Sequence, residues 1–179
     1  MEHRLLYSTE AFVPQEPFVQ EFGVARVVRK GSDMTIVAVS NMVVESLRAA
    51  ELLAEVGVEA EVIDPISLVP LDMETILESC KRTKKLLVVD NAWLACGASA
   101  EIVAGVIERA GSSAGIEVAR MGFANTPCPT SPWLEYHFYP NAGTIAAKAW
   151  AMARNGEKLW QPDEEKTKLA YQIQFRGPF

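Results

Sequence analysis

The segment LLVVDNAWLACGASAEI, residues 86–102, joins an apolar run to Asp90, a turn of small residues and a helical pattern. In an α/β protein, ligands usually bind at such a place, beyond the carboxyl end of a strand. Ser99 lies in this turn, within the sequence GASAE. A hydrolase nucleophile elbow has the pattern G-x-S-x-G, and its second glycine is missing here. We therefore expect Ser99 to be a helix cap or a small packing residue, not a nucleophile.

Two pairs of side chains could also do chemistry. Cys128 and His137 flank a Pro-rich turn and could form a thiol–imidazole pair, but the sequence supplies no third residue to orient them. A buried thiol and a surface histidine are the favoured interpretation. Asp64 and Asp90 end two strands that we expect to be adjacent, and they could form an acid pair. The favoured interpretation is that each caps a neighbouring turn or helix, which leaves no catalytic set.

Signatures of nucleotide and metal sites are missing from the sequence. The turn VSNMVVES, which follows an apolar run, contains no glycine, and neither G-x-G-x-x-G nor G-x-x-x-x-G-K-[ST] occurs. His3 and His137 are too far apart in the chain to suggest a metal site. The three cysteines form no C-x-x-C pair, which argues against a zinc site or a disulfide framework. We therefore expect a reducing, cytoplasmic location.

The composition is that of a globular domain. The chain has 179 residues, 49% of them hydrophobic and 22% charged, with a formal net charge of -6. No basic block is present to neutralise phosphates, so we expect no nucleic-acid partner. No apolar run approaches the length of about 20 residues that a membrane span needs, and no pattern resembles a signal peptide, so we expect no membrane partner.

Strand and helix patterns alternate along the chain. VARVVRKG, MTIVAV, VEAEVID, LLVVD and IEVARM read as strands, and LLVVD is apolar throughout, which is typical of a central strand. Helices are expected after Asn41 and after Asp72, each of which can provide an N-cap, and at about 99–110 and 142–153. Gly57 and Gly111 are expected to end the first and third of these helices.

This alternation predicts a three-layer α/β/α fold with a mostly parallel sheet. We predict a domain at 23–155, preceded by an arm or linker at 1–22 and followed by an extension at 156–179. The extension ends in YQIQF, which could add an edge strand, wrap a neighbour or form a loosely ordered terminus.

Several segments, in order, resemble the C-terminal domain of the transketolase family. They are EHRLLY, TIVAVS, SLRAAELLAEVGVEAEVID, LVPLDMETI, LLVVDNAWLACGASAEI and GFANTPCPTSPWLEYHFYP. The likeness is greatest to the beta subunits of thiamine-diphosphate-dependent 2-oxo acid dehydrogenases, of the pyruvate, branched-chain and acetoin types, and it covers about residues 2–154. The chain departs from the family at Asp90-Asn91-Ala92, at Asp64-Pro65-Ile66-Ser67 and in its tail, so the resemblance does not identify the 2-oxo acid substrate.

The resemblance implies an assembly domain that is not catalytic alone. In such enzymes thiamine diphosphate lies between the alpha subunit and the N-terminal domain of the beta subunit, so the cofactor and its magnesium are expected in the whole enzyme and not on this chain. The implied partners are the alpha subunit, a second beta subunit and the dihydrolipoyl acyltransferase core. The alternatives are a fragment of a transketolase or of a deoxyxylulose-phosphate synthase, and a free-standing interaction or regulatory module.

Large aromatic residues in turns suggest where partners bind, because Trp and Tyr are enriched at interfaces. At least one of Trp93, Trp133, Trp150 and Trp160 is expected at an interface. The candidate interface residues are Trp93, Trp133, Asp90, Phe138 and Tyr139. We predict no catalytic, cofactor-binding or metal-binding residue in this chain.

Overall fold

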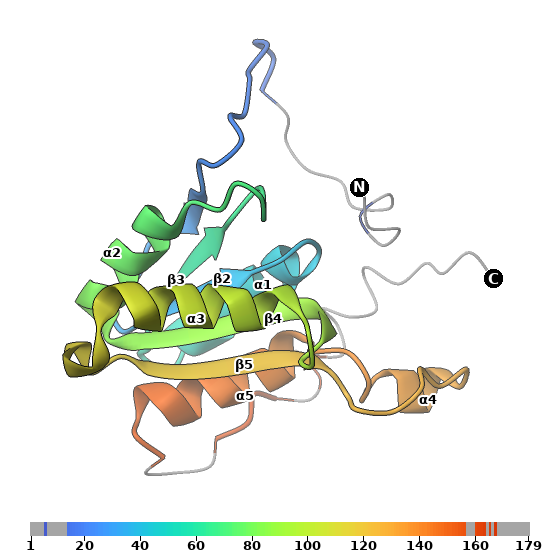
Figure 1. Ribbon diagram of the computed structural model, residues 1–179. Coiled ribbons are helices and arrows are strands. Elements are labelled where there is room, and N and C mark those ends of the chain that lie inside the picture. The colour runs from blue at the N-terminus through green and yellow to red at the C-terminus, as the bar shows by residue number, and fades with distance from the viewer. Residues whose placement is uncertain (1–5, 7–13, 157–159, 164, 166, 168–179) are drawn as a thin grey trace.

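A computed structural model describes residue 6 and residues 14–156, 160–163, 165 and 167. Its sheet has five strands in the order β1-β3-β2-β4-β5 (Figure 1). The strands are β1 (Arg26–Arg29), β2 (Met34–Ala38), β3 (Ala60–Asp64), β4 (Lys85–Trp93) and β5 (Glu117–Phe123). β1 pairs with β3 in antiparallel fashion, and the β2–β3, β2–β4 and β4–β5 pairs are parallel. The predicted mostly parallel sheet is therefore confirmed.

Helices cover both faces of the sheet. They are α1 (Met42–Ala54), α2 (Met73–Thr83), α3 (Ala98–Ala110), α4 (Pro132–Glu135) and α5 (Ala142–Ala153). α1 and α5 pack on one face, against Ile36, Val62 and Leu87, and α2 and α3 pack on the other face, against Val37 and Val88. In Figure 1, α3 and α5 lie on opposite sides of β4 and β5. This arrangement is the predicted three-layer α/β/α fold.

The interior of β4 explains its apolar sequence. Leu86, Leu87, Val88 and Val89 are fully buried because β4 lies between β2 and β5 and both of its faces are covered. The strand extends further than the apolar run, through Asp90 to Trp93, with an irregular register between Val89 and Trp93. The residues DNAW therefore belong to the strand, and the turn starts only after them.

A buried polar network fixes α2 to the sheet. The Thr35 hydroxyl lies 2.6 Å from the Ser79 hydroxyl and 2.7 Å from the Thr83 hydroxyl. The Ser79 hydroxyl donates to the Glu61 carboxylate at 2.6 Å, and the Arg82 guanidinium donates to the same oxygen. Each polar side chain of this network thus has a partner, as its removal from water requires.

The helix ends confirm some of the predicted caps and correct others. The Asp72 carboxylate accepts the Thr75 N–H, as an N-cap does. Asn41 lies at the N-cap position of α1, but its side chain makes no cap hydrogen bond, so the prediction of a side-chain cap is wrong there. α1 ends at Ala54 and not at Gly57, although Gly57 follows in the left-handed conformation. In α3, Ile102 and Val106 are buried, whereas Ile107 is 37% exposed.

The structure describes the predicted N-terminal arm and C-terminal extension only in part. Residues 14–22 contain no helix or strand, and Phe18 and Phe22 in this segment are 63% and 82% exposed. The segment YQIQF, and all of EHRLLY except Leu6, lie outside the described residues. In the described part of the chain, no helix is both long enough and apolar enough to cross a bilayer.

Candidate functional site

The turn between β4 and α3 is held by Asp90, which is 3% exposed. One oxygen of its carboxylate accepts the Ser99 N–H at 3.1 Å, in the first turn of α3. The N-cap position is occupied by Gly97. A Cβ atom on Gly97 would collide with the Trp93 carbonyl oxygen and lie 3.2 Å from the Asp90 carboxylate, so only glycine fits this approach. Asp90 therefore caps α3 from the preceding strand.

Ser99 is a buried residue of the first turn of α3. The expectation of a Ser99 cap is wrong, because the N-cap is Gly97 and the Ser99 backbone is itself capped by Asp90. Its side chain is fully buried, and its hydroxyl has no hydrogen-bond partner. This burial fits the packing role and leaves no path for a substrate to reach the hydroxyl.

Asp64 and Asp90 do not form an acid pair. The prediction placed them on adjacent strands, but β2 lies between β3 and β4 in the sheet. The Asp64 carboxylate accepts the Ile66 N–H at 3.0 Å, and Asp90 accepts the Ser99 N–H. Each carboxylate thus binds the backbone of its own loop, which is the favoured interpretation from the sequence.

Cys128 and His137 are not brought together as a catalytic pair. The Cys128 sulfur lies 3.5 Å from the Tyr139 hydroxyl, and the His137 ring packs against the Tyr136 ring. His137 is exposed as expected, but Cys128 is also exposed, so the expectation of a buried thiol is wrong for it. The buried thiol is Cys80, and burial raises its pKa to about 12, so it remains protonated at neutral pH.

Four aromatic rings form a cluster at the carboxyl end of β4 and β5. The Trp93 ring meets the edge of the Phe123 ring, with 5.3 Å between centroids, and lies 6.1 Å from the Phe138 ring. The Phe123 ring lies 5.0 Å from Phe138 and 5.1 Å from Tyr139. The contacts of Trp93 with Phe123 and Phe138, and of Phe123 with Tyr139, are edge-to-face, which is favourable because a positive ring edge meets a negative ring face. The cluster therefore fixes the position of Trp93.

Gly122 brings β5 close to the end of β4. A Cβ atom on Gly122 would collide with the Ala92 carbonyl oxygen and lie 3.2 Å from a Leu94 methyl group. The Arg120 guanidinium donates to the Leu94 carbonyl at 2.9 Å. These contacts hold Trp93 and Leu94 at the rim of the aromatic cluster.

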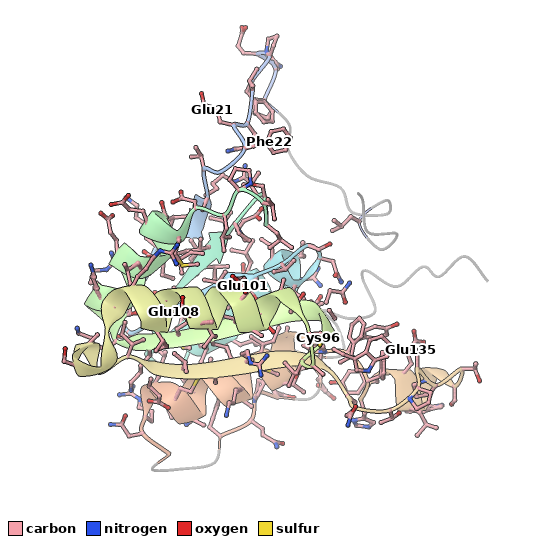
Figure 2. The ribbon with its side chains drawn as sticks, in the orientation of Figure 1. Glu21, Phe22, Cys96, Glu101, Glu108 and Glu135 are labelled. Carbon is pink, nitrogen blue, oxygen red and sulfur yellow. The ribbon has the colours of Figure 1, made fainter. Side chains whose placement is uncertain are left out.

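Several apolar side chains at this end are exposed. Trp93 is 46% exposed, Leu94 36%, Trp133 84% and Leu134 60%. α4, which carries Trp133 and Leu134, projects from the body of the molecule in Figure 1, and Glu135 of α4 lies beyond Cys96 at the same end in Figure 2. We call this set of residues the aromatic surface: Trp93, Leu94, Phe123, Trp133, Leu134, Phe138 and Tyr139. Exposed apolar groups at one end of a molecule, such as Trp93, Leu94, Trp133 and Leu134, are a feature of protein–protein interfaces.

The structure separates the predicted interface residues by exposure. Trp93 and Trp133 reach solvent, and Tyr139 is partly buried. Phe138 and Asp90 are each 3% exposed, so in this chain they support the surface from beneath. Trp150 and Trp160 stack on each other, with 5.3 Å between centroids. Phe123, Leu94 and Leu134 were not among the predicted interface residues, although Leu134 is next to Trp133 on a four-residue helix too short to bury both.

Metal-ligating side chains are not clustered in the described part of the chain. Among the described residues, no three His, Cys, Asp or Glu side chains are placed to hold a metal ion. The carboxylates of Asp64 and Asp90, at the strand ends, are engaged with backbone N–H groups. The arrangement offers an apolar contact surface that the ring cluster supports.

Comparisons with known proteins identify the family of this domain. Residues 23–145 match the family model described as "Transketolase, C-terminal domain". The beta subunit of acetoin:2,6-dichlorophenolindophenol oxidoreductase from Cupriavidus necator is 42% identical over 158 residues, which are 87% of this chain and 46% of that protein. The pyruvate dehydrogenase E1 component subunit beta from Bacillus subtilis is 38% identical over 142 residues, which are 76% of this chain and 44% of that protein.

A solved structure of a transketolase chain is also similar to this chain. The structure described as "Split gene transketolase, inactive beta4 tetramer" superposes with a TM-score of 0.70 and 26% identity, over 82% of this chain and 46% of that one. The chain thus spans less than half the length of each of these three relatives. Because the family model covers most of the ordered sheet and its helices, the resemblance is confirmed, and the chain belongs to the transketolase C-terminal domain family.

Proposed function

We propose that this chain is the C-terminal assembly domain of a 2-oxo acid dehydrogenase beta subunit. In that role it supports thiamine-diphosphate-dependent oxidative decarboxylation and acyl transfer to lipoamide by the whole cytoplasmic enzyme, and it is not catalytic alone. The beta-subunit relatives support the class of enzyme. The observation that carries the assembly role is the aromatic surface, on which a cluster of rings holds exposed Trp93 in place.

The proposed partners are an alpha subunit, a second beta subunit and a dihydrolipoyl acyltransferase core. Charged side chains beside the aromatic surface include Arg120, whose guanidinium donates to the Leu94 carbonyl, and Glu135, which ends α4. The exposed tryptophan rings are uncharged, so a partner that covers them does not bury a charge there, which would be costly. Thiamine diphosphate and magnesium are proposed for the whole enzyme, on segments other than those described here.

A second candidate function is assembly within a transketolase. The similarity to the split-gene transketolase supports it, at a lower identity than that of the beta-subunit relatives. The two candidates are distinguished by co-expressing the chain with the alpha subunit encoded in the same genome. Co-purification with that subunit supports the dehydrogenase, and co-purification with the other half of a transketolase supports the second candidate.

Sedimentation velocity tests the assembly role. The double variant Trp93→Ala/Trp133→Ala is expected to shift self-association, or association with the alpha subunit, at least tenfold toward free chains, because exposed aromatic anchors dominate binding energy. Phe22→Ala is the matched control, since Phe22 is an aromatic residue 82% exposed on a different part of the surface (Figure 2). Unchanged sedimentation of the double variant, with an unchanged circular dichroism spectrum, would contradict the proposal.

A further inference from the structure

A groove lies between the segment that enters β1, the first turn of α2 and the last turn of α3. Its volume is about 510 Å³, within the range of about 300–1,000 Å³ that is typical of small-ligand sites. It is lined by Gly23, Leu71, Asp72, Met73, Glu74, Leu77 and Arg109. Figure 2 shows Glu108, the neighbour of Arg109, at the end of α3 opposite to Cys96. The groove is therefore separate from the aromatic surface.

The floor of the groove is apolar and fixed by the core. Leu71, Met73 and Leu77 pack against the buried cluster beneath α2 and α3. Gly105 of α3 gives two of the lining side chains their room. A Cβ atom there would lie 2.6 Å from the Met73 methyl carbon and 3.0 Å from Nη1 of Arg109. The Arg109 side chain can therefore fold back over its own helix, where Nη1 donates to the Gly105 carbonyl at 3.1 Å.

Two opposite charges line the groove without a counter-ion. Within the described part of the chain, neither Arg109 nor Glu74 forms a salt bridge, and both line the same volume. The guanidinium carries five N–H donors, and the bond to Gly105 uses one nitrogen, so donors remain for a ligand. Glu74 is an exposed residue in the first turn of α2, and in the described part of the chain its carboxylate forms no ion pair.

Asp72, the third charged residue of the lining, is committed to the fold. Its carboxylate accepts the Ala25 N–H at 2.9 Å, the Thr75 N–H at 3.1 Å and the Thr75 hydroxyl at 2.7 Å. Burial acts to raise the pKa of Asp72, but these hydrogen bonds outweigh it and hold the pKa below its ordinary value. The charges available to a ligand are therefore one cation and one anion, beside an apolar floor.

We infer that this groove binds an apolar zwitterion, whose carboxylate meets Arg109, whose ammonium meets Glu74 and whose aliphatic part covers Leu71, Met73 and Leu77. A free apolar α-amino acid and a short apolar peptide share this chemistry. A ligand with a single charge would leave the other charged residue of the groove without a partner as it is covered, which is unfavourable.

Titration of the ¹⁵N-labelled chain, followed by nuclear magnetic resonance, tests this inference. Leucine or leucyl-leucine is expected to give saturable shifts of the amides of Gly105, Met73 and Leu77. 4-Methylpentanoate lacks the ammonium group and 3-methylbutylamine lacks the carboxylate, so each is expected to bind about tenfold more weakly, as the loss of one charge-assisted hydrogen bond implies. If leucine binds more tightly, the ligand is a free amino acid; if leucyl-leucine binds more tightly, it is a short peptide.

Substitutions test whether binding depends on the two charged residues of the groove or only on the net charge of the chain. Arg109→Gln and Glu74→Gln are each expected to weaken binding about tenfold, again by one charge-assisted hydrogen bond. Glu78→Gln is the matched control, because Glu78 is exposed on α2 and does not line the groove. The inference is overturned if neither zwitterion shifts the groove amides, if a single-charge analogue binds equally well, or if Glu78→Gln weakens binding as much. Sedimentation does not enter this test, so its outcome is independent of the assembly role.

Discussion

Asp90 lies near the carboxyl end of β4, where its buried carboxylate accepts the Ser99 N–H. Asp90→Ala removes this acceptor and leaves a helix N–H without a partner. The expected loss is about 1–2 kcal/mol of the free energy of unfolding, as for other lost caps. Urea denaturation followed by circular dichroism measures it.

Two further substitutions make the Asp90 result specific. Asp90→Asn keeps an acceptor oxygen and is expected to recover part of the lost stability. Glu78→Ala changes an exposed residue on α2 and is expected to alter stability by less than about 0.5 kcal/mol. If Asp90→Ala is no less stable than the wild type, the carboxylate does not hold the turn.

Glu45 makes stability depend on pH through one buried carboxyl group. Burial raises the pKa of Glu45 above its ordinary value of 4.5, against the lowering effects of the Ala142 N–H and of Arg48. The folded state therefore binds this proton more tightly than the unfolded state does. The resulting stabilisation is full below about pH 4.5 and is lost as the pH rises through the raised pKa of the folded state.

The variant Glu45→Gln removes this titration but keeps an oxygen for the Ala142 N–H, which Glu45 accepts at 2.9 Å. We expect the free energy of unfolding of the variant, minus that of the wild type, to increase with pH above 4.5. Urea denaturation at a series of pH values measures this difference. Glu51→Gln, an exposed change on the same helix, is the control. A difference that is flat or falls with pH would contradict the assignment.

Lys85 connects two elements, since it begins β4 and its ammonium caps the last turn of α5. Its Nζ donates to the carbonyls of Met152 and Ala153 at 2.6 and 2.9 Å, and to the Asn155 side chain at 3.0 Å. Lys85→Met keeps a similar stem and removes the donors. The expected loss of stability is about 1.5–3 kcal/mol, which is typical of hydrogen bonds to charged groups. Chemical denaturation measures the loss.

The neighbouring residue provides a control for Lys85. Lys84→Met removes an exposed ammonium that donates only to the Ala114 carbonyl, at 3.2 Å, so a smaller loss is expected. Hydrogen exchange adds a local measurement, because Lys85→Met should speed exchange at the end of α5 more than elsewhere. Equal losses for the two variants would show that the cap of α5 is not responsible.

The positions of the helices and strands follow from local patterns, but their order in the sheet does not. Asp72 caps α2 as its residue type predicts, because the interaction lies within four residues. Asp64 and Asp90 were expected on adjacent strands, and β2 separates them, because strand order depends on crossovers that no local pattern encodes. The buried hydroxyl of Thr35 is a similar case, since its partners Ser79 and Thr83 lie 44 and 48 residues away.

The aromatic surface was predictable in part. Trp93 and Trp133 lie in or beside turns that cannot bury a large ring, and both are exposed. Their place at an interface stays a prediction. The support for Trp93 could not be predicted, since Phe123 comes from a strand 30 residues later and Phe138 from a loop beyond that. The exposure of Cys128 likewise depends on the path of that loop.

At the scale of the whole molecule, the chain covers less than half of its beta-subunit relatives, and the described residues form no metal-binding cluster. We therefore expect this chain alone to show no saturable binding of thiamine diphosphate with magnesium in isothermal titration calorimetry. The complex with the alpha subunit and a full-length beta subunit is the positive control. Tight binding by the isolated chain would place the cofactor on this domain and contradict the proposal.

The strand order has a consequence for synthesis on the ribosome. β2 is buried along its whole length, yet both of its neighbours in the sheet, β3 and β4, come later in the chain. At the usual rate of about 5–20 residues per second, the exposed MTIVA segment waits several seconds before β4 has been made. β1 also stays unpaired until β3 has been made, because it pairs with β3 and not with β2. The nascent chain therefore exposes an apolar, unpaired strand during translation.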